Sequence, residues 1–557
     1  MQNKTIFFLY FLVGLVYLVG LFIPLMENDS AQHASMAMKM VLNNDFLHIY
    51  KGNAPYLDKP HLHFWFSAWS MQLFGINQVA YRLPALLFLA LGAFYTFKLS
   101  KLLYPQSGHI AALLFLVSQT IILSGHDVRT DAVMTGAVII GVYNLVAFLR
   151  EGKWGHAVGG GLGMAMALGS KGMVGVGIIG LFVLCYLLYS REWRGLLRWN
   201  LALVVLSFVL GIAPVVYAYY VQFDLNPDLI VHGRQGVSGV RFILWDQSFN
   251  RFSGDDFGAT NSDYLFFFHS LLWMFIPFSL PLYGAIFRKS AGLLKHGFKR
   301  MPNYEFLTIG GFWTVMLVFS FSEFKLPHYL NSMIPMLSVL GAAYLMELYR
   351  RESQVETKVY LFFHCLLIAA GLALIGYISG VAFPPQNGFQ YFALVLVGLG
   401  MVWLVRMLFS KHHVVVRYIY SGVLFAVTLN LFLNSQLYPA LAQYQAGWQV
   451  ARELKADDGS LAMSPDEILL LDHYTNWTLD FYTATNIRRV PEREVALLKG
   501  QYLLVKSKDL ERMQGEGLET ETLMEAYQYR ITQVKPAFLN PDTREAQLEF
   551  YQLVKIL

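Results

Sequence analysis

Long apolar runs separated by short polar turns fill the chain up to about residue 435. A helix needs about 20 apolar residues to cross a bilayer, and about thirteen runs approach that length. They lie near residues 5–25, 82–103, 109–124, 131–149, 155–170, 172–190, 199–221, 264–287, 304–321, 328–348, 358–382, 388–409 and 413–435. The third and fifth runs are short, so the count stays open by about one or two. The pattern predicts an α-helical polytopic membrane protein whose transmembrane domain covers residues 1–435.

Polar residues become frequent again after about residue 440. Four short runs with strand-like composition follow, and helix-like segments separate them. These runs are 468–474, 501–507, 525–534 and 545–557. We expect residues 436–557 to form a small α/β domain exposed to water.

Composition and loop charge support a membrane protein and give it an orientation. The 557 residues are 56% hydrophobic and 14% charged, whereas soluble domains carry roughly 25% charged residues. Excess Lys and Arg marks cytoplasmic loops. Such residues lie at 98, 101, 150, 153, 191, 194, 198, 288–300, 350, 351, 411 and 417. We therefore expect a multi-pass membrane protein with a cytoplasmic amino terminus and a carboxyl-terminal domain on the outer side.

Two further expectations concern processing and partners. No small-residue cleavage site precedes Glu27, so the run 5–25 is expected to be a retained span rather than a signal peptide. The net charge of +5 is spread over many loops. This distribution argues against a nucleic-acid surface.

Several basic residues on the outer side run against the charge bias, and most stand beside carboxylates. Ionisable groups near hydrocarbon usually pair or line a polar cavity. The groups are Asp29; Asp58 with Lys59; Asp127, Arg129 and Asp131; Lys171; Asp246 with Arg251; and Glu323 with Lys325 and His328. Because they come from many separate loops, we expect one convergent pocket. A lipid phosphate fits this pocket, since Lys and Arg bind phosphate oxygens.

Each group also has a simpler interpretation. Asp29 could only terminate the first span, and Lys59 could be an interfacial anchor. His61 and His63, with Asp58 nearby, could seat a divalent cation or could be ordinary polar residues. The joint pattern, rather than any single residue, favours a site.

These motifs resemble those of the GT-C superfamily of polyprenyl-phosphate-dependent glycosyltransferases. The resemblance is closest to the bacterial aminoarabinose (lipid A) transferase branch, which is similar to the protein O-mannosyltransferases. The matching stretches are Asp29-Ser30-Ala31-Gln32, Asp58-Lys59-Pro60-His61 with Phe64-Trp65, Arg82-Leu83-Pro84, Asp131, Ser170-Lys171-Gly172, Phe249-Asn250-Arg251-Phe252 and Lys325-Leu326-Pro327-His328-Tyr329. Members that hold a metal use a Glu where this chain has Asp58 and a His where it has Ser248.

The resemblance implies an inverting transfer of a sugar from an undecaprenyl-phosphate-linked donor. The reaction would take place at the outer face of a bacterial inner membrane, with the carboxyl-terminal domain in the periplasm. Asp29 would act as the general base on the acceptor or would orient it, and Asp131 would position Asp29's partners or the sugar. The substrate-binding residues would be Lys59, Asp58, Arg82, Lys171, Arg251, Lys325, His328 and Tyr329. A divalent metal stays possible, with Asp58, His61 and His63 as its candidate ligands.

The acceptor stays open among a lipid A-type lipid, a surface glycan and a protein side chain. Two other classes compete with an enzyme. A transporter or flippase for a lipid-linked solute would be expected to show an internal repeat and charges near mid-membrane, whereas the charged groups here gather at one face. An assembly subunit would not need Lys and Asp on so many separate outer loops.

Overall fold

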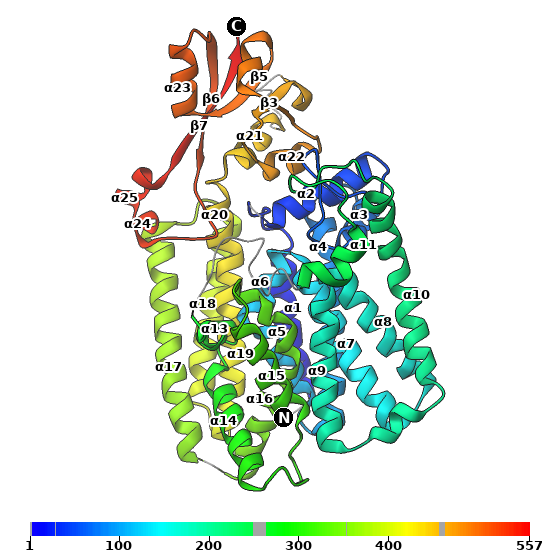
Figure 1. Ribbon diagram of the computed structural model, residues 1–557. Helices are drawn as coiled ribbons and strands as arrows, with labels where there is room; N and C mark the ends of the chain where they lie inside the picture. The colour runs from blue at the N-terminus through cyan, green and yellow to red at the C-terminus, as the bar shows by residue number, and fades with distance from the viewer. Residues whose placement is uncertain (1–2, 28, 249–262, 353, 456–462) are drawn as a thin grey trace.

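The computed structural model of the chain describes residues 3–27, 29–248, 263–352, 354–455 and 463–557. Most of these residues form a bundle of long helices, and a smaller domain of strands and helices caps one end of it (Figure 1). The carboxyl terminus lies in this cap, and the amino terminus lies at the opposite end of the bundle. The expected architecture, a helical polytopic membrane protein with a mixed carboxyl-terminal domain, is confirmed.

Within the described residues, eight helical runs are long and apolar enough to cross a membrane. They are Gln78–Leu103 (α4), Thr130–Glu151 (α7), Met173–Ser190 (α9), Leu201–Asp224 (α10 with η2), Pro327–Arg350 (η4 with α16), Val355–Ala382 (within α17 and η5), Gly388–Leu408 (α18) and Val414–Ala442 (α19 to α20). A ninth would be the pair α5 (Gly108–Val117) and α6 (Gln119–His126), which is bent by 58°.

The count is therefore lower than the expected thirteen because several of the apolar runs form short or broken helices. The run 264–287 divides into α13 (Phe266–Met274) and α14 (Ser279–Lys295). Helices α1 (Asn3–Gly20), α8 (Trp154–Lys171) and α15 (Leu307–Ser320) also pack in the bundle. An apolar run in the sequence can be buried in lipid or in protein, so counting such runs overestimates the number of membrane-spanning helices.

Two helices of the segment between α1 and α4 lie at the capped end of the bundle (Figure 1). Helix α2 (Asp29–Leu42) begins a few residues after α1 ends, and α3 (Leu62–Phe74) follows a short hairpin of β1 (Tyr50–Lys51) and β2 (Ala54–Pro55). Lys39 of α2 is buried, and its ammonium donates to the carbonyl of Gly52 at 2.5 Å. This bond ties α2 to the hairpin that leads into α3.

The cap contains a five-stranded sheet of order β4-β3-β5-β7-β6. Its strands are β3 (Ile468–Leu471), β4 (Arg488–Val490), β5 (Tyr502–Lys506), β6 (Thr520–Gln528) and β7 (Glu549–Ile556). The first three strands in this order pair in parallel, and β7 pairs antiparallel with both β5 and β6. Helices α21 (Ala446–Leu454), α22 (Trp477–Thr483) and α23 (Ser507–Gly515) belong to this domain. The division at residue 435 stays a prediction, and the last long helical run continues to Ala442.

The segment after α1 joins the cap to the bundle. The Glu27 carboxylate accepts hydrogen bonds from the backbone N–H groups of Trp477 (2.7 Å) and Thr478 (3.0 Å), at the start of α22. The Gln445 side chain donates to the carbonyl of Leu25 at 3.0 Å and accepts from the N–H of Glu27 at 2.5 Å. Leu25 and Glu27 are thus held by residues 445, 477 and 478.

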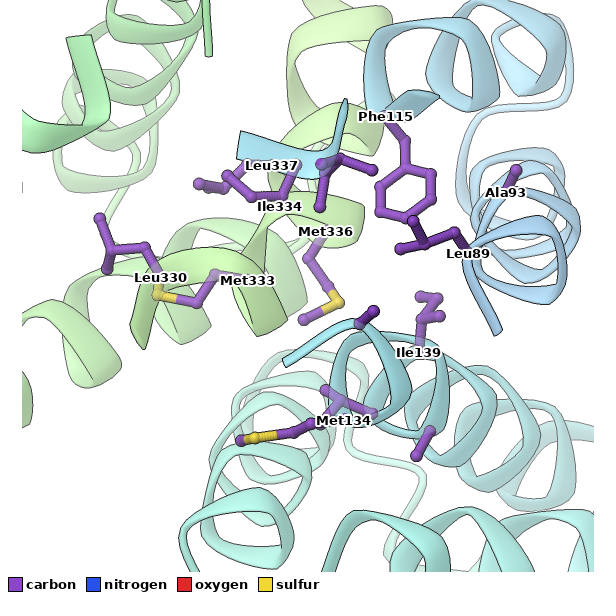
Figure 2. Close-up of a cluster of buried hydrophobic side chains, with 14 of the residues drawn as sticks. Leu89, Ala93, Phe115, Met134, Ile139, Leu330, Met333, Ile334, Met336 and Leu337 are labelled. Atoms are coloured by element: carbon purple, nitrogen blue, oxygen red, sulfur yellow. The ribbon is translucent and has the colours of Figure 1, made fainter. Parts of the chain in front are cut away.

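The buried core of the bundle aligns the elements that carry the site (Figure 2). Side chains of α4, α5, α7, η4 (Pro327–Met333) and α16 (Ile334–Arg350) meet there. Those labelled in Figure 2 are Leu89, Ala93, Phe115, Met134, Ile139, Leu330, Met333, Ile334, Met336 and Leu337. Because α7 packs against η4, the first residues of both elements arrive at the same end of the bundle.

Candidate functional site

The centre of the site is a buried ion pair between two helices. Asp131 lies in the first turn of α7, and Lys171 is the last residue of α8. The Lys171 ammonium lies 2.5 Å from one carboxylate oxygen of Asp131, and both side chains are less than a tenth exposed. The imidazole of His328, in η4, lies 3.9 Å from the other oxygen. The Lys171 ammonium also lies 4.7 Å from the centre of the Tyr329 ring.

A second ion-pair group surrounds Arg129. Its guanidinium lies 3.0 Å from the Asp29 carboxylate and 2.9 Å from the Asp127 carboxylate. The negative charge of Asp127, and to a smaller extent that of Asp29, raises the pKa of Arg129 above its ordinary value. Asp131 also acts electrostatically on Arg129, so the two groups are neighbours. The Asp29 side chain is 49% exposed, which leaves its carboxylate accessible to a substrate.

Lys59 and Lys325 are two further cations that the sequence predicted for the site. Lys59 lies close enough to His33 and His328 to act electrostatically on both. Lys325 precedes η4, is 7% exposed, and its ammonium lies 5.4 Å from the centre of the Tyr264 ring. Asp58 offers its backbone carbonyl to the side-chain amide of Gln247. Arg251 lies outside the described residues.

Arg82 has a different environment from that expected of a phosphate ligand. Its side chain is fully buried, and its guanidinium donates to the carbonyls of His126 (2.8 Å) and Leu21 (2.9 Å). It also donates to the carbonyl of Ile23 and, at 3.4 Å, to that of Pro24. Arg82 therefore fixes the segment after α1 that leads to Asp29, and we leave it out of the proposed phosphate ligands.

The expected metal ligands point in different directions. His61 donates through Nε2 to the carbonyl of Leu47 at 3.0 Å, whereas His63 lies 3.3 Å from the hydroxyl of Tyr81. Burial lowers the pKa of each imidazole to about 4. In the described part of the chain, no group of three or more His, Cys, Asp or Glu residues could hold a metal ion. The described residues therefore do not fit a metal ion.

Tyr81 connects His63 to the loop that carries Arg129. The Tyr81 hydroxyl donates to the carbonyl of Val128 at 2.9 Å, so its oxygen is left to accept from Nε2–H of His63. Neutral His63 then presents an unprotonated Nδ1, which is buried and has no hydrogen-bond partner in the described structure. These two hydrogen bonds link His63 of α3 and Tyr81 of α4 to the loop between α6 and α7. They fix the backbone at Val128, which lies between Asp127 and Arg129 in the sequence.

Sequence reasoning did not find His33 or Glu27. His33 is four residues after Asp29 on α2, and its buried ring lies 5.7 Å from that of His63. The i, i+4 spacing on a helix was the signal that could have revealed it. Glu27 forms its bonds with residues about 450 positions away, and no local pattern predicts such a contact.

Comparisons with known proteins identify distant relatives of this chain. The profile of the family described as dolichyl-phosphate-mannose-protein mannosyltransferase matches residues 58–218. The chain is 27% identical over 360 residues to the undecaprenyl phosphate-alpha-4-amino-4-deoxy-L-arabinose arabinosyl transferase of Pseudomonas paraeruginosa, covering 61% of this chain and 59% of that protein. It is 26% identical over 417 residues to the Pseudomonas aeruginosa protein of the same name, covering 71% and 70%. The chain thus spans less than two thirds of the first relative's length.

The fold is also that of a solved structure. The crystal structure of ArnT from Cupriavidus metallidurans bound to undecaprenyl phosphate matches with a TM-score of 0.73 at 18% identity, covering 99% of this chain and 98% of that one. The chain therefore has the fold of this ArnT structure and is distantly related in sequence to the proteins above. The matched residues 58–218 include Lys59, Arg129, Asp131 and Lys171.

Proposed function

We propose that the chain moves a sugar from an undecaprenyl-phosphate-linked donor to an acceptor at the outer face of a bacterial inner membrane. The names of the curated relatives support the donor class. The observation that carries the proposal is that Lys59, Lys171 and Asp131 all lie close enough to His328 to act on it electrostatically. Lys325 precedes His328 by three residues. These groups come from elements far apart in the chain, as a site for a charged substrate requires.

The cations would hold the phosphate of the donor. Lys59 and Lys325, with Arg251, are the proposed ligands, and their charge acts most strongly when the departing phosphate gains negative charge. Lys171 is engaged by Asp131 at 2.5 Å. We therefore assign this pair to shaping the site beside the phosphate, where Lys171 also lies over the Tyr329 ring. Asp58, His328 and Tyr329 would line the same region.

Asp29 would act on the acceptor. Its exposed carboxylate could accept the proton of an attacking hydroxyl group, while Arg129 fixes its orientation at 3.0 Å. Asp29 could instead orient an acceptor that is already anionic. Direct displacement of the phosphate predicts inversion at the anomeric carbon.

The proposed acceptor is a lipid A-type lipid or a surface glycan. A protein hydroxyl is the second candidate, because the matching family profile is described as a protein mannosyltransferase. Mass spectrometry of surface lipids and glycoproteins from cells with and without the chain would decide between them. The acceptor class is the one that loses a hexose or pentose when the chain is absent.

Transfer measured in membranes that contain the donor tests the role of Asp29. We expect Asp29→Asn to lower transfer by about 100-fold or more while donor binding is kept. Asp45→Asn is the matched control, because Asp45 lies in the same outer loop and accepts from the N–H groups of Leu47 (3.1 Å) and His48 (3.2 Å). Wild-type transfer by Asp29→Asn would overturn the assignment.

A further inference from the structure

A basic cavity lies at the end of the bundle opposite the cap. It has a volume of about 650 Å³ and lies between the end of α9 and the segment that joins α14 to α15. Its lining residues are Leu188, Tyr189, Arg191, Gly297, Phe298, Lys299, Arg300 and Phe306. Three of these are cations, and none is an acid.

The backbone that carries two of the cations is fixed by hydrogen bonds to Tyr189. Arg300 donates from Nε to the carbonyl of Tyr189 at 3.0 Å. The Tyr189 hydroxyl in turn donates to the carbonyl of Lys299 and accepts from the N–H of Met301, each at 3.1 Å. Tyr189 thus clamps the segment 299–301 to the end of α9, beside Arg191.

Acidic residues close by in the sequence are turned away from the cavity. The Glu192 carboxylate accepts from the hydroxyl of Tyr186 at 2.7 Å. Glu305 accepts from the Tyr104 hydroxyl at 3.1 Å and from the N–H of Thr308 at 2.9 Å. Among the described residues, no ion pair joins Arg191, Lys299 or Arg300 to a carboxylate. The positive charge of the cavity is therefore uncompensated within this part of the protein.

The rim of the cavity is apolar and exposed. Leu188 is 54% exposed and Phe298 is 48% exposed. Leu184 and Leu294, one turn back on α9 and α14, are exposed as well. In a membrane protein such surface faces lipid tails, so the cavity joins a phosphate-binding group to a surface for acyl chains.

We infer that this cavity binds the phosphodiester headgroup of an anionic phospholipid in the leaflet opposite the candidate active site. Basic pockets between membrane helices recognise such headgroups. Arg191 and Arg300 would contact phosphate oxygens, and Lys299 would add a third positive charge. The acyl chains would lie along Leu188 and Phe298. This site is independent of the proposed transfer reaction.

The test measures lipid binding to the purified full-length protein by native mass spectrometry and by titration in mixed micelles. We expect phosphatidylglycerol to bind and phosphatidylcholine not to compete. The variant Arg191→Gln/Lys299→Gln/Arg300→Gln should lose about 100-fold in affinity, because each cation near an anionic lipid contributes about fivefold. The control Arg194→Gln/Lys295→Gln/Lys411→Gln removes three exposed cations outside the cavity lining and should bind as the wild type does.

Equal losses in the two triple variants would overturn the inference, because general surface charge would then explain the binding. Equal binding of inorganic phosphate in a competition assay would also overturn it, since the ligand would then be a free anion and not a lipid. The thermal midpoint of each variant in detergent is recorded first, and a single substitution, Lys299→Gln, is tested in parallel. Lys299 is exposed and its side chain forms none of the clamping bonds, so this variant should fold.

Discussion

The ion pair between Asp131 and Lys171 gives the sharpest energetic prediction. The two charges are 2.5 Å apart and both side chains are nearly inaccessible. At an effective dielectric constant of about 20, the direct attraction is about 7 kcal/mol, and desolvation offsets much of it. Removing one partner leaves the other charge buried alone, which costs about 3–5 kcal/mol. We expect Asp131→Asn and Lys171→Met each to destabilise the protein by that amount.

The double variant Asp131→Asn/Lys171→Met isolates the interaction energy between the two side chains from the effects of each substitution alone. With both charges absent no buried ion is left alone, so the double variant should be less destabilised than the sum of the single variants by about 1–3 kcal/mol. Unfolding of the purified protein in detergent, followed by tryptophan fluorescence, measures all four corners of this cycle. Single variants that unfold like the wild type, or strictly additive effects, would refute the reasoning.

Two other predictions concern residues near Asp29. Arg82→Lys should lower the thermal midpoint by several degrees, because a single ammonium cannot satisfy four carbonyls, while undecaprenyl phosphate affinity stays within about twofold; an affinity loss without a stability loss would instead identify Arg82 as a phosphate ligand. Burial raises the pKa of Glu27 to about 7. The contribution of this group to the free energy of unfolding is therefore fully present below about pH 4.5 and is lost as the pH rises through about 7. The loss is at most about 3 kcal/mol. Glu27→Gln should remove this pH dependence of the thermal midpoint, and an unchanged profile would contradict it.

Much of the fold could be predicted from hydrophobic patterning. The expected apolar runs contain helices, and the expected strand runs 468–474, 501–507 and 545–557 contain β3, β5 and β7. The run 525–534 overlaps only the end of β6, which begins earlier, at Thr520. Strand β4 was missed because it is only three residues long and begins with Arg488 and Arg489. The bend between α5 and α6 was missed because periodicity reports which faces are apolar and not how an axis turns.

Prediction of the site was limited by groups whose partners are backbone atoms. An arginine near the outer face looks like an anion ligand in sequence, yet the carbonyls left open after α1 engage Arg82. His61 and His63 alternate, and on a helix residues two apart point about 200° apart. Their divergence follows once residues 62–74 are known to form α3 rather than an extended segment.

The central claim, that cations from separate loops hold a polyprenyl phosphate, is tested most directly by the affinity of the purified protein for undecaprenyl phosphate. A charged hydrogen bond contributes about 1.5–3 kcal/mol, so Lys59→Gln and Lys325→Gln should each weaken binding by about 10- to 100-fold. Lys51→Gln, an exposed lysine of the same outer loop as Lys59, should bind as the wild type does. Unchanged affinity in both Lys59→Gln and Lys325→Gln would contradict the account.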